Sequence, residues 1–430
     1  MSFISSEVMY MVTWKRYYIL ILYMLLIYWT TMLRTSDTDV NLILDGVYHM
    51  SYTSHYIIET IPAMMFIPGA VLSTFIYNRY SLKVGICIGA FTQALGSIIN
   101  ILTSVHYAYL FIGQSLCALA YPMIILCCSL VAVKWFEDSK RVLATSIAVS
   151  ITYSWFIKGF GISNIVVNLE EDEQSQKVQL AVVFGIEAFV TALIALLTLF
   201  TFQSQPKVPP SAAAEMYRDD DVLGTYRQLV FNREFMLLSW SQVWYYAMIV
   251  WITSNIDTIA KMYQISDSQI INIELWNVNF GVLGSILLGI FLHFTKLFKT
   301  AYLAIGILSF IGWFSLFFVI DKGYTSLCIL FSCLGFVQCQ MISICYIFSW
   351  EVAYPLKETT VLGFIRPCCI VIGEFFNLIF TIILNRNQTK QMVTIFTSIM
   401  WVFTLLGIIF TVCMKPVNSP VIEYNQVGKF

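Results

Sequence analysis

The sequence predicts an all-α membrane protein whose twelve transmembrane helices form two six-helix bundles. Two observations carry this prediction. Of the 430 residues, 59% are hydrophobic and 11% are charged, which lies outside the composition of soluble globular proteins. The hydrophobic residues also gather in runs of about 20 positions, the length a helix needs to cross the hydrocarbon core of a bilayer.

Twelve such runs follow one another along the chain, six before and six after a polar interruption. The predicted spans are residues 16–33, 55–77, 83–104, 107–133, 142–166, 179–203, 235–260, 268–292, 299–320, 324–349, 359–384 and 391–414. The interruption contains QPKVPPSAAAEMYRDDD, and its prolines, small residues and charges are typical of a linker. Two six-helix halves of this kind place a binding site near the membrane midplane, between the halves.

The lysines and arginines indicate which side of the membrane each loop faces. With the N-terminus in the cytoplasm, 16 of the 24 fall on the cytoplasmic side and six on the other, as the positive-inside rule requires. The predicted domains are a cytoplasmic N-terminus (1–15), an N-terminal bundle (16–203), a cytoplasmic linker (204–233), a C-terminal bundle (234–414) and a cytoplasmic tail (415–430). We expect the plasma membrane, with an organelle membrane as the alternative.

Ionisable residues lie within the predicted spans, where a charge is costly unless it faces a partner or a wet cavity. The five singled out here, among others in the spans, are Glu59, Lys158, Glu187, Arg366 and Glu374. Lys158 and Arg366 lie deep in spans that are equivalent in the two halves, so each bundle would offer one cation to an anionic substrate group. The alternative is structural ion pairs, Lys158 with Glu59 or Glu187, and Arg366 with Glu374 or another acid.

Two of the acids are candidates for coupling transport to an ion. A buried carboxylate such as Glu374 can take up and release a proton during a transport cycle. Glu59 lies nearer the outer end of its span and is the second candidate, or else an acid of the outer vestibule.

Aromatic and amide side chains within the spans are further candidates for substrate contact. They are Trp29, Gln114, Tyr153, Trp155 and Trp244. Trp240, Trp244 and Trp251 share one face of the seventh span and could stack on a planar or cationic ligand. Packing against other helices or against lipid is the alternative.

Neither an enzyme nor an ATP-driven pump is expected, because the sequence contains no G-x-S-x-G, P-loop or H-E-x-x-H motif. The eleven cysteines form no C-x-x-C spacing, so no metal or cofactor is expected. A net charge of −1 without a long basic run argues against nucleic acid as a partner. The expected partners are a small-molecule substrate and the lipid bilayer, and we expect a monomer.

Several segments, taken together, resemble the major facilitator family named for the feline leukaemia virus subgroup C receptor. EVAYPLKETTVLGFI is similar to that family's loop between the tenth and eleventh spans. KWFEDSKRVLATSIA resembles its loop after the fourth span, and IGQSLCALAYP resembles the fourth span itself. The matches follow the family's order over most of the chain. The resemblance implies the major facilitator fold, transport of haem-related cargo or choline-like amines, and a gate at the first of these loops, with candidate residues Glu351, Tyr354, Pro355 and Glu358.

The sequence also departs from this family in two places. In the loop after the second span, Asn78 and Ser81 stand where the superfamily has Asp and Gly, while Arg79 and Lys83 are retained; Asn78, Arg79 and Lys83 are further gate candidates. Where choline-carrying relatives place glutamine and tyrosine around the ligand, this chain aligns Tyr153, Val250 and Ile370. The residues that surround the amine in those relatives are therefore not found at the aligned positions of this chain.

The predicted function is secondary transport of a small organic solute by alternating access. Lys158 and Arg366 favour an organic anion or a zwitterion with a carboxylate, such as a haem-like porphyrin. The alternatives are a choline/ethanolamine-type amine transporter of the same family, and a transport-inactive membrane receptor or scaffold.

Overall fold

The computed structural model describes residues 13–34, 44, 47–50, 52–156, 172–210 and 221–415. Its α-helices follow the predicted apolar runs, with the exception of α11 (Val222–Phe231), which lies in the predicted linker. They are α1 (Lys15–Leu33), α3 (Tyr52–Arg79), α4 (Leu82–Ile101), α5 (Ala108–Ile125), α6 (Cys128–Trp135), α7 (Asp138–Ser150), α9 (Glu173–Thr201), α11 (Val222–Phe231), α12 (Arg233–Met262), α13 (Asp267–Thr295), α14 (Phe298–Val319), α15 (Tyr324–Ala353), α16 (Glu358–Arg386) and α17 (Lys390–Cys413). Short 3-10 helices are η1 (Leu102–Ser104), η2 (Ile151–Phe156) and η3 (Ile320–Lys322).

Eleven helical segments among the described residues are long and apolar enough to cross a membrane. Each coincides with a predicted span to within a few residues. The fifth predicted span, 142–166, is described as α7 and η2 as far as Phe156, and the rest of it lies outside the described residues. The expectation of an all-α membrane protein with this order of spans is confirmed.

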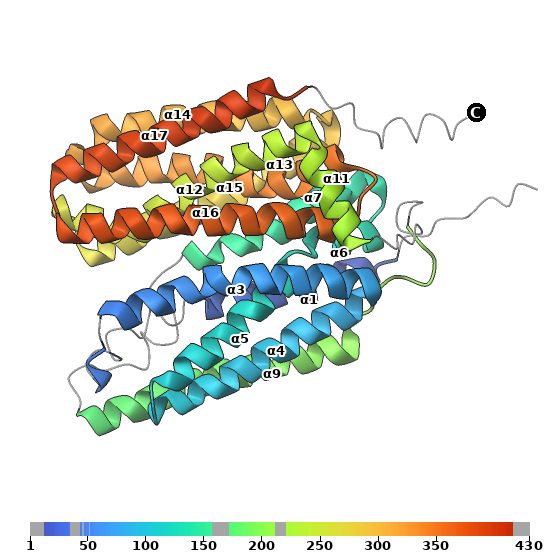
Figure 1. Cartoon of the computed structure of the whole chain (residues 1–430), viewed down its shortest axis with the longest axis horizontal. Coiled ribbons are helices and arrows are strands. Elements are labelled where there is room, and N and C mark those ends of the chain that lie inside the picture. Colours follow the sequence, from blue (N-terminus) through green and yellow to red (C-terminus); the bar gives the residue numbers. More distant parts are fainter. Residues whose placement is uncertain are drawn as a thin grey trace, which may run out of the picture.

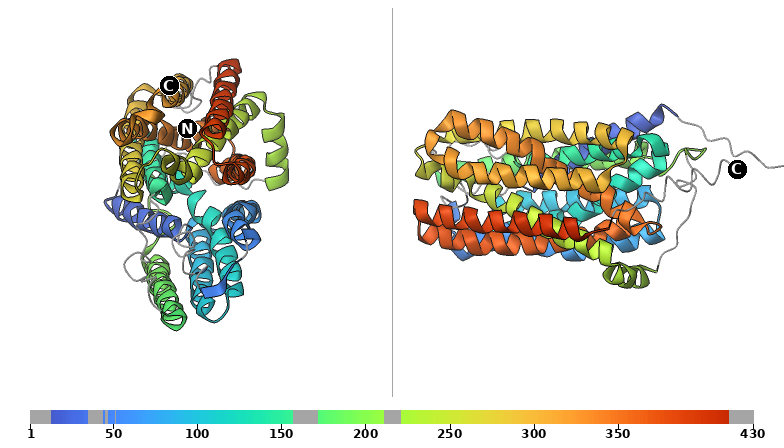
Figure 2. Two further views of the ribbon diagram at one scale, coloured as in Figure 1. Left: turned by 90° about the vertical axis from the view of Figure 1, so that its left-hand side faces the viewer. Right: turned by 90° about the horizontal axis from the view of Figure 1, so that it is seen from above.

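The helices form two groups that lie side by side (Figures 1 and 2). In the first, α4 packs against α5 and α9, and α3 packs against α5. In the second, α13 packs against α15, and α12 packs against α16 and α17. The two groups touch where α7 packs against α13 and α15 and where α3 packs against α16. We call them the N-half (α1 to α9) and the C-half (α12 to α17).

The fourth predicted span is two helices, α5 and α6, separated by a break at residues 126–127. At the break, Cys127 leaves the helical conformation with φ −92° and ψ 8°. Tyr23 of α1 donates a hydrogen bond to the carbonyl of Ile124, and Tyr77 of α3 donates one to the carbonyl of Met123, both at 2.6 Å. These buried hydroxyls bond carbonyls of the last turn of α5, where a helix leaves its carbonyls without intrahelical partners.

The linker contains a helix that the sequence pattern did not predict. Helix α11 begins after Asp221, whose carboxylate accepts hydrogen bonds from two backbone amides of the first turn at 3.2 Å, as an N-cap residue does. Tyr226 of α11 donates to Thr74 of α3 at 3.2 Å, and its ring lies 5.7 Å from that of Phe364 in α16. The linker therefore contacts both halves.

Candidate functional site

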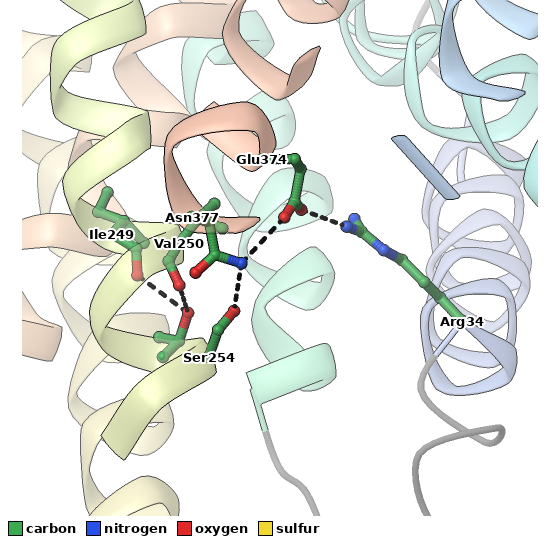
Figure 3. A network of polar contacts seen from close by, with 7 residues as sticks. Arg34, Ile249, Val250, Ser254, Glu374 and Asn377 are labelled. Carbon is green, nitrogen blue, oxygen red and sulfur yellow. Dashed lines mark hydrogen bonds and ion pairs between the residues drawn. The ribbon is translucent and has the colours of Figure 1, made fainter. Parts of the chain in front are cut away.

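An ion pair joins the N-half to the C-half through buried side chains. Nη2 of Arg34, directly after α1, lies 3.2 Å from Oε1 of Glu374 in α16, and the two side chains are 13% and 19% exposed. Asn377, one turn further along α16, donates to Oε2 of Glu374 at 3.3 Å and to Oγ of Ser254 in α12 at 3.1 Å (Figure 3). One carboxylate is therefore tied both to the N-half and, through Asn377, to a second helix of the C-half.

The sequence reasoning missed Arg34 as a partner of Glu374. From the sequence, Arg366 was the alternative partner of Glu374. The structure instead pairs Glu374 with a residue 340 positions away, which no local pattern encodes. A possible signal was the position of Arg34 itself, a lone basic residue that ends an apolar run on the side where basic residues are scarce.

Arg366 lies deep in the C-half, and its side chain sits between two tyrosine rings. The residue is 5% exposed, and its guanidinium carbon lies 5.1 Å from the ring centre of Tyr246 in α12 and 5.6 Å from that of Tyr346 in α15. Its Nε is buried without a hydrogen-bond partner among the described residues. Aromatic faces stabilise a cation but supply no counter-charge, so this environment suits an anion brought by a ligand.

Tyr246 brings the two arginines into one cluster. The guanidinium carbon of Arg366 lies 5.1 Å from its ring centre, and Arg34 and Glu374 are close enough for their charges to act on its hydroxyl group. The Arg34 guanidinium in turn lies 5.4 Å from the ring centre of Tyr121. We call Arg34, Tyr121, Tyr246, Arg366 and Glu374 the central cluster. It contains two guanidinium groups against one carboxylate, so its formal charge is positive and it favours an anionic partner.

Gln114 lies close to this cluster. Its side chain, on α5, is 3% exposed and lines a small pocket together with Arg34 and Tyr121. Gln114, which was predicted from the sequence as a candidate site residue, therefore shares a pocket with Arg34 of the central cluster.

Tyr153 links the two halves at η2. Its hydroxyl donates to the carbonyl of Cys339 in α15 and lies 2.8 Å from Oγ of Ser343. Of the other candidates in this part of the sequence, Lys158 lies outside the described residues, and so do the side chains of Trp155 and Glu59.

The tryptophan candidates each make contacts within one half. Trp29 donates from Nε1 to Thr191 of α9 at 2.8 Å, which is a contact inside the N-half. Trp244 packs against Phe376 and Phe403, with ring centres 6.0 Å and 4.6 Å away, inside the C-half. These contacts favour a packing role for both residues.

The predicted tryptophan face of the seventh span does not present one common surface. Trp240 is 42% exposed on the outside of the protein, whereas Trp251 is 0% exposed in the core. Packing against lipid and against other helices accounts for these two residues.

The predicted gate residues lie where α3 meets α16. Asn78 at the end of α3 donates to Oγ1 of Thr360 at 3.2 Å, and Lys357 donates from Nζ to the carbonyl of Tyr77 at 2.7 Å. A Cβ added to Gly363 would overlap Oγ1 of Thr74, so α3 and α16 approach to a distance that requires glycine. We call this region the gate end.

The other gate candidates surround this contact. Glu351 and Glu358 are buried at 6% and 4% exposure, on either side of the turn that contains Tyr354 and Pro355. Arg79 lies over the ring of Phe75 of its own helix at 5.9 Å, and the backbone amide of Lys83 donates to Oγ of Ser204 at 3.0 Å.

A further contact between the halves, along α7, was not predicted from the sequence. Nδ1 of His293, near the end of α13, hydrogen-bonds the carbonyl of Ser139. Gly289 of α13 packs against Ser146 of α7, and a Cβ added at Gly289 would overlap the Cβ of Ser146. Among the described residues, no group of three or more His, Cys, Asp and Glu side chains is arranged to hold a metal ion.

Comparison with known proteins identifies transporters as relatives, although no family model matches the chain. The choline/ethanolamine transporter flvcr2a of Danio rerio is 28% identical over 82% of this chain and 76% of its own length. The choline/ethanolamine transporter FLVCR1 of Felis catus is 24% identical over 87% of this chain and 68% of its own length.

Solved structures share the fold at low sequence identity. The major facilitator superfamily transporter FucP, in its outward conformation, matches with a TM-score of 0.70 at 13% identity, over 92% of this chain and 98% of FucP. The proton:xylose symporter XylE matches with a TM-score of 0.72 at 11% identity, over 93% of this chain and 95% of XylE.

Proposed function

We propose that the solute transported by this chain carries an anionic group, which binds at Arg366. The chain is a major facilitator superfamily transporter that resembles the feline leukaemia virus subgroup C receptor-related family. Transport proceeds by alternating access, with the central cluster between the two halves as the solute site. The observation that carries the substrate class is the buried guanidinium of Arg366, whose Nε has no hydrogen-bond partner among the described residues.

A zwitterion reconciles this charge with the named relatives. Those relatives are choline/ethanolamine transporters, whose solutes are cations. An ammonium group on the solute fits the carboxylate of Glu374, while a carboxylate or phosphate on the same solute fits Arg366. An amine without an anionic group would leave the positive formal charge of the cluster unbalanced.

The contacts at the gate end support alternating access. With both termini in the cytoplasm, as the lysine and arginine distribution favours, the gate end faces the cytoplasm. Asn78–Thr360 and Lys357–Tyr77 then close the cytoplasmic side of the solute site. A solute that binds the two conformations with different affinity shifts the halves between them. We place the transporter in the plasma membrane.

A choline/ethanolamine-type amine remains the second candidate solute. The observation that favours it is the ring of tyrosines around the cluster, because Tyr121, Tyr246 and Tyr346 all present faces to cations. In this alternative, Arg366 has a structural role and the amine binds beside Glu374.

Uptake into proteoliposomes tests transport and substrate class together. The solutes are two matched pairs, choline with glycine betaine and ethanolamine with glycine, in which a hydroxymethyl group is replaced by a carboxylate. We expect saturable uptake, faster for the carboxylate member of each pair. Faster uptake of choline and ethanolamine would favour the amine alternative, and no uptake of any of the four solutes would contradict the proposal.

A further inference from the structure

The N-half contains a small pocket beside the central cluster. It is lined by Thr30, Arg34, Gln114, Cys117 and Tyr121, with Pro62 and Ala118 as its remaining, apolar walls. All of these residues come from α1, α3 and α5 or directly follow α1. The pocket therefore moves with the N-half, whereas Arg366 moves with the C-half.

Gln114 lines this pocket, and its amide nitrogen is buried without a partner among the described residues. Its side chain is 97% buried, at 3% exposure, and its Nε2 has no hydrogen-bond partner among the described residues. Buried polar groups are nearly always hydrogen-bonded, and an unpaired amide in a pocket is favourable only if another molecule supplies the missing partner.

The other polar groups of the pocket define which partner fits. Thr30 is already engaged, since its Oγ1 lies 2.7 Å from the carbonyl of Leu26 and 2.9 Å from Oε1 of Gln93. Gln114 and Arg34 both line the pocket with N–H groups, and Arg34, which is cationic, is also paired with Glu374. N–H donors of this kind bind an acceptor oxygen, and they bind an anionic one most strongly.

We propose that this Gln114 pocket is a subsite of the transport site that binds an acceptor oxygen of the solute. The proposal rests on the proposed function, and it adds that the solute carries a second oxygen-bearing group besides the one at Arg366. Such a solute touches Gln114 on the N-half and Arg366 on the C-half at once. Because Arg34 both lines the pocket and pairs with Glu374, an anionic oxygen there also competes with Glu374 for Arg34.

Cys117 allows the pocket to be tested without knowing the solute. The purified full chain in lipid nanodiscs is treated with two methanethiosulfonates of similar size, one with a sulfonate and one with a trimethylammonium group, and modification of Cys117 is followed by peptide mass spectrometry. The measured quantity is the ratio of the reaction rate of the anionic reagent to that of the cationic reagent. We expect this ratio to be about tenfold higher for Cys117 than for a free thiol, because a unit negative charge is attracted to a nearby guanidinium at the effective dielectric of a protein.

Variants of Gln114 separate the subsite from general packing. Gln114→Leu should reduce the preference for the anionic reagent, and Gln114→Glu should reverse it by placing a negative charge in the pocket. Gln338→Leu is the matched control: Gln338 is also buried, at 4% exposure, with an unpartnered Nε2, but it lies on α15 and away from the pocket. It should leave the preference unchanged.

Two results would overturn the subsite. One is an equal or higher relative rate for the cationic reagent in the wild type, and the other is no modification of Cys117 by either reagent, which would mean that the pocket is closed to solutes and serves packing or a bound water. Either result can occur while the proteoliposomes still take up a carboxylate solute, so failure of the subsite is distinguishable from failure of the proposed function.

Discussion

Arg34 and Glu374 form an ion pair of 3.2 Å that connects α1, near the start of the chain, to α16, near its end. The same carboxylate accepts a hydrogen bond from Asn377, which also donates to Ser254 of α12. Three helices from both halves therefore meet at one acid. Any movement that separates α1 from α16 must break this pair, so we propose it as a control point of the proposed alternating access.

The Arg34–Glu374 pair should show strong energetic coupling. Arg34→Ala and Glu374→Ala each leave a mostly buried charge without its partner, which destabilises a protein more than removal of both. We expect a coupling free energy of about 0.5–3 kcal/mol from a double-mutant cycle on thermal or denaturant unfolding in detergent. Strictly additive single and double variants would show that the pair contributes nothing to holding the halves together.

Protons should speed uptake through Glu374. Protonation of its carboxyl group removes the negative charge that pairs with Arg34. The contact between the two halves therefore weakens when the medium that has access to Glu374 becomes more acidic. We expect an inwardly directed proton gradient to accelerate uptake of the preferred solute in wild-type proteoliposomes and to have no effect in Glu374→Gln. The control is Glu187→Gln, since Glu187 is a buried acid of α9 outside the central cluster. A gradient response that survives in Glu374→Gln would assign coupling to another residue.

The close approach of α3 and α16 at the gate end should depend on Gly363. The methyl group of Gly363→Ala would overlap Oγ1 of Thr74, and overpacking of this kind costs about 1–3 kcal/mol, so the closed gate should become roughly tenfold less populated or more. Uptake should fall accordingly without loss of expression. Gly185→Ala is the matched control, because no atom lies within 4 Å of the added Cβ. Equal uptake by the two variants would argue against a gate at this contact.

Tyr153 should affect conformation as well as stability. Its hydroxyl bonds the carbonyl of Cys339 across the two halves, whereas the hydroxyl of Tyr302 lies 3.0 Å from Oγ of Ser241 within the C-half. Tyr153→Phe and Tyr302→Phe should each cost about 1 kcal/mol of unfolding free energy. We expect Tyr153→Phe alone to change the maximal uptake rate. Equal maximal uptake rates for Tyr153→Phe and Tyr302→Phe would contradict a role of Tyr153 in the conformational change.

Most of the fold could be predicted from the sequence, because a bilayer fixes how long an apolar helix must be and forbids unpaired backbone within it. The predicted ends of α9 and α16 lie within a few residues of those in the structure. What the pattern could not predict are local features that tertiary contacts decide. The break between α5 and α6 is stabilised by Tyr23 and Tyr77 from other helices, and α11 packs on both halves through Tyr226.

The site was predicted less completely. A charged or amide side chain in an apolar run is conspicuous, which is why Arg366, Glu374 and Gln114 could be selected from the sequence. The partners of those residues could not, because they come from distant parts of the chain. Arg34 follows the first span and looked like a loop residue, yet it lies between the Gln114 pocket and Glu374. Tyr246 was part of an aromatic-rich helix, and its place between two arginines appears only in three dimensions.

The most direct test of the account is the effect of Arg366 on the choice between choline and glycine betaine. Uptake of both solutes is measured in proteoliposomes for the wild type, Arg366→Gln and the control Arg227→Gln, which removes an exposed arginine of α11. We expect the wild type and Arg227→Gln to prefer glycine betaine, and Arg366→Gln to lose that preference by about tenfold or more, since a charged hydrogen bond is worth about 1.5–3 kcal/mol. An unchanged preference in Arg366→Gln would contradict an anionic group bound at Arg366.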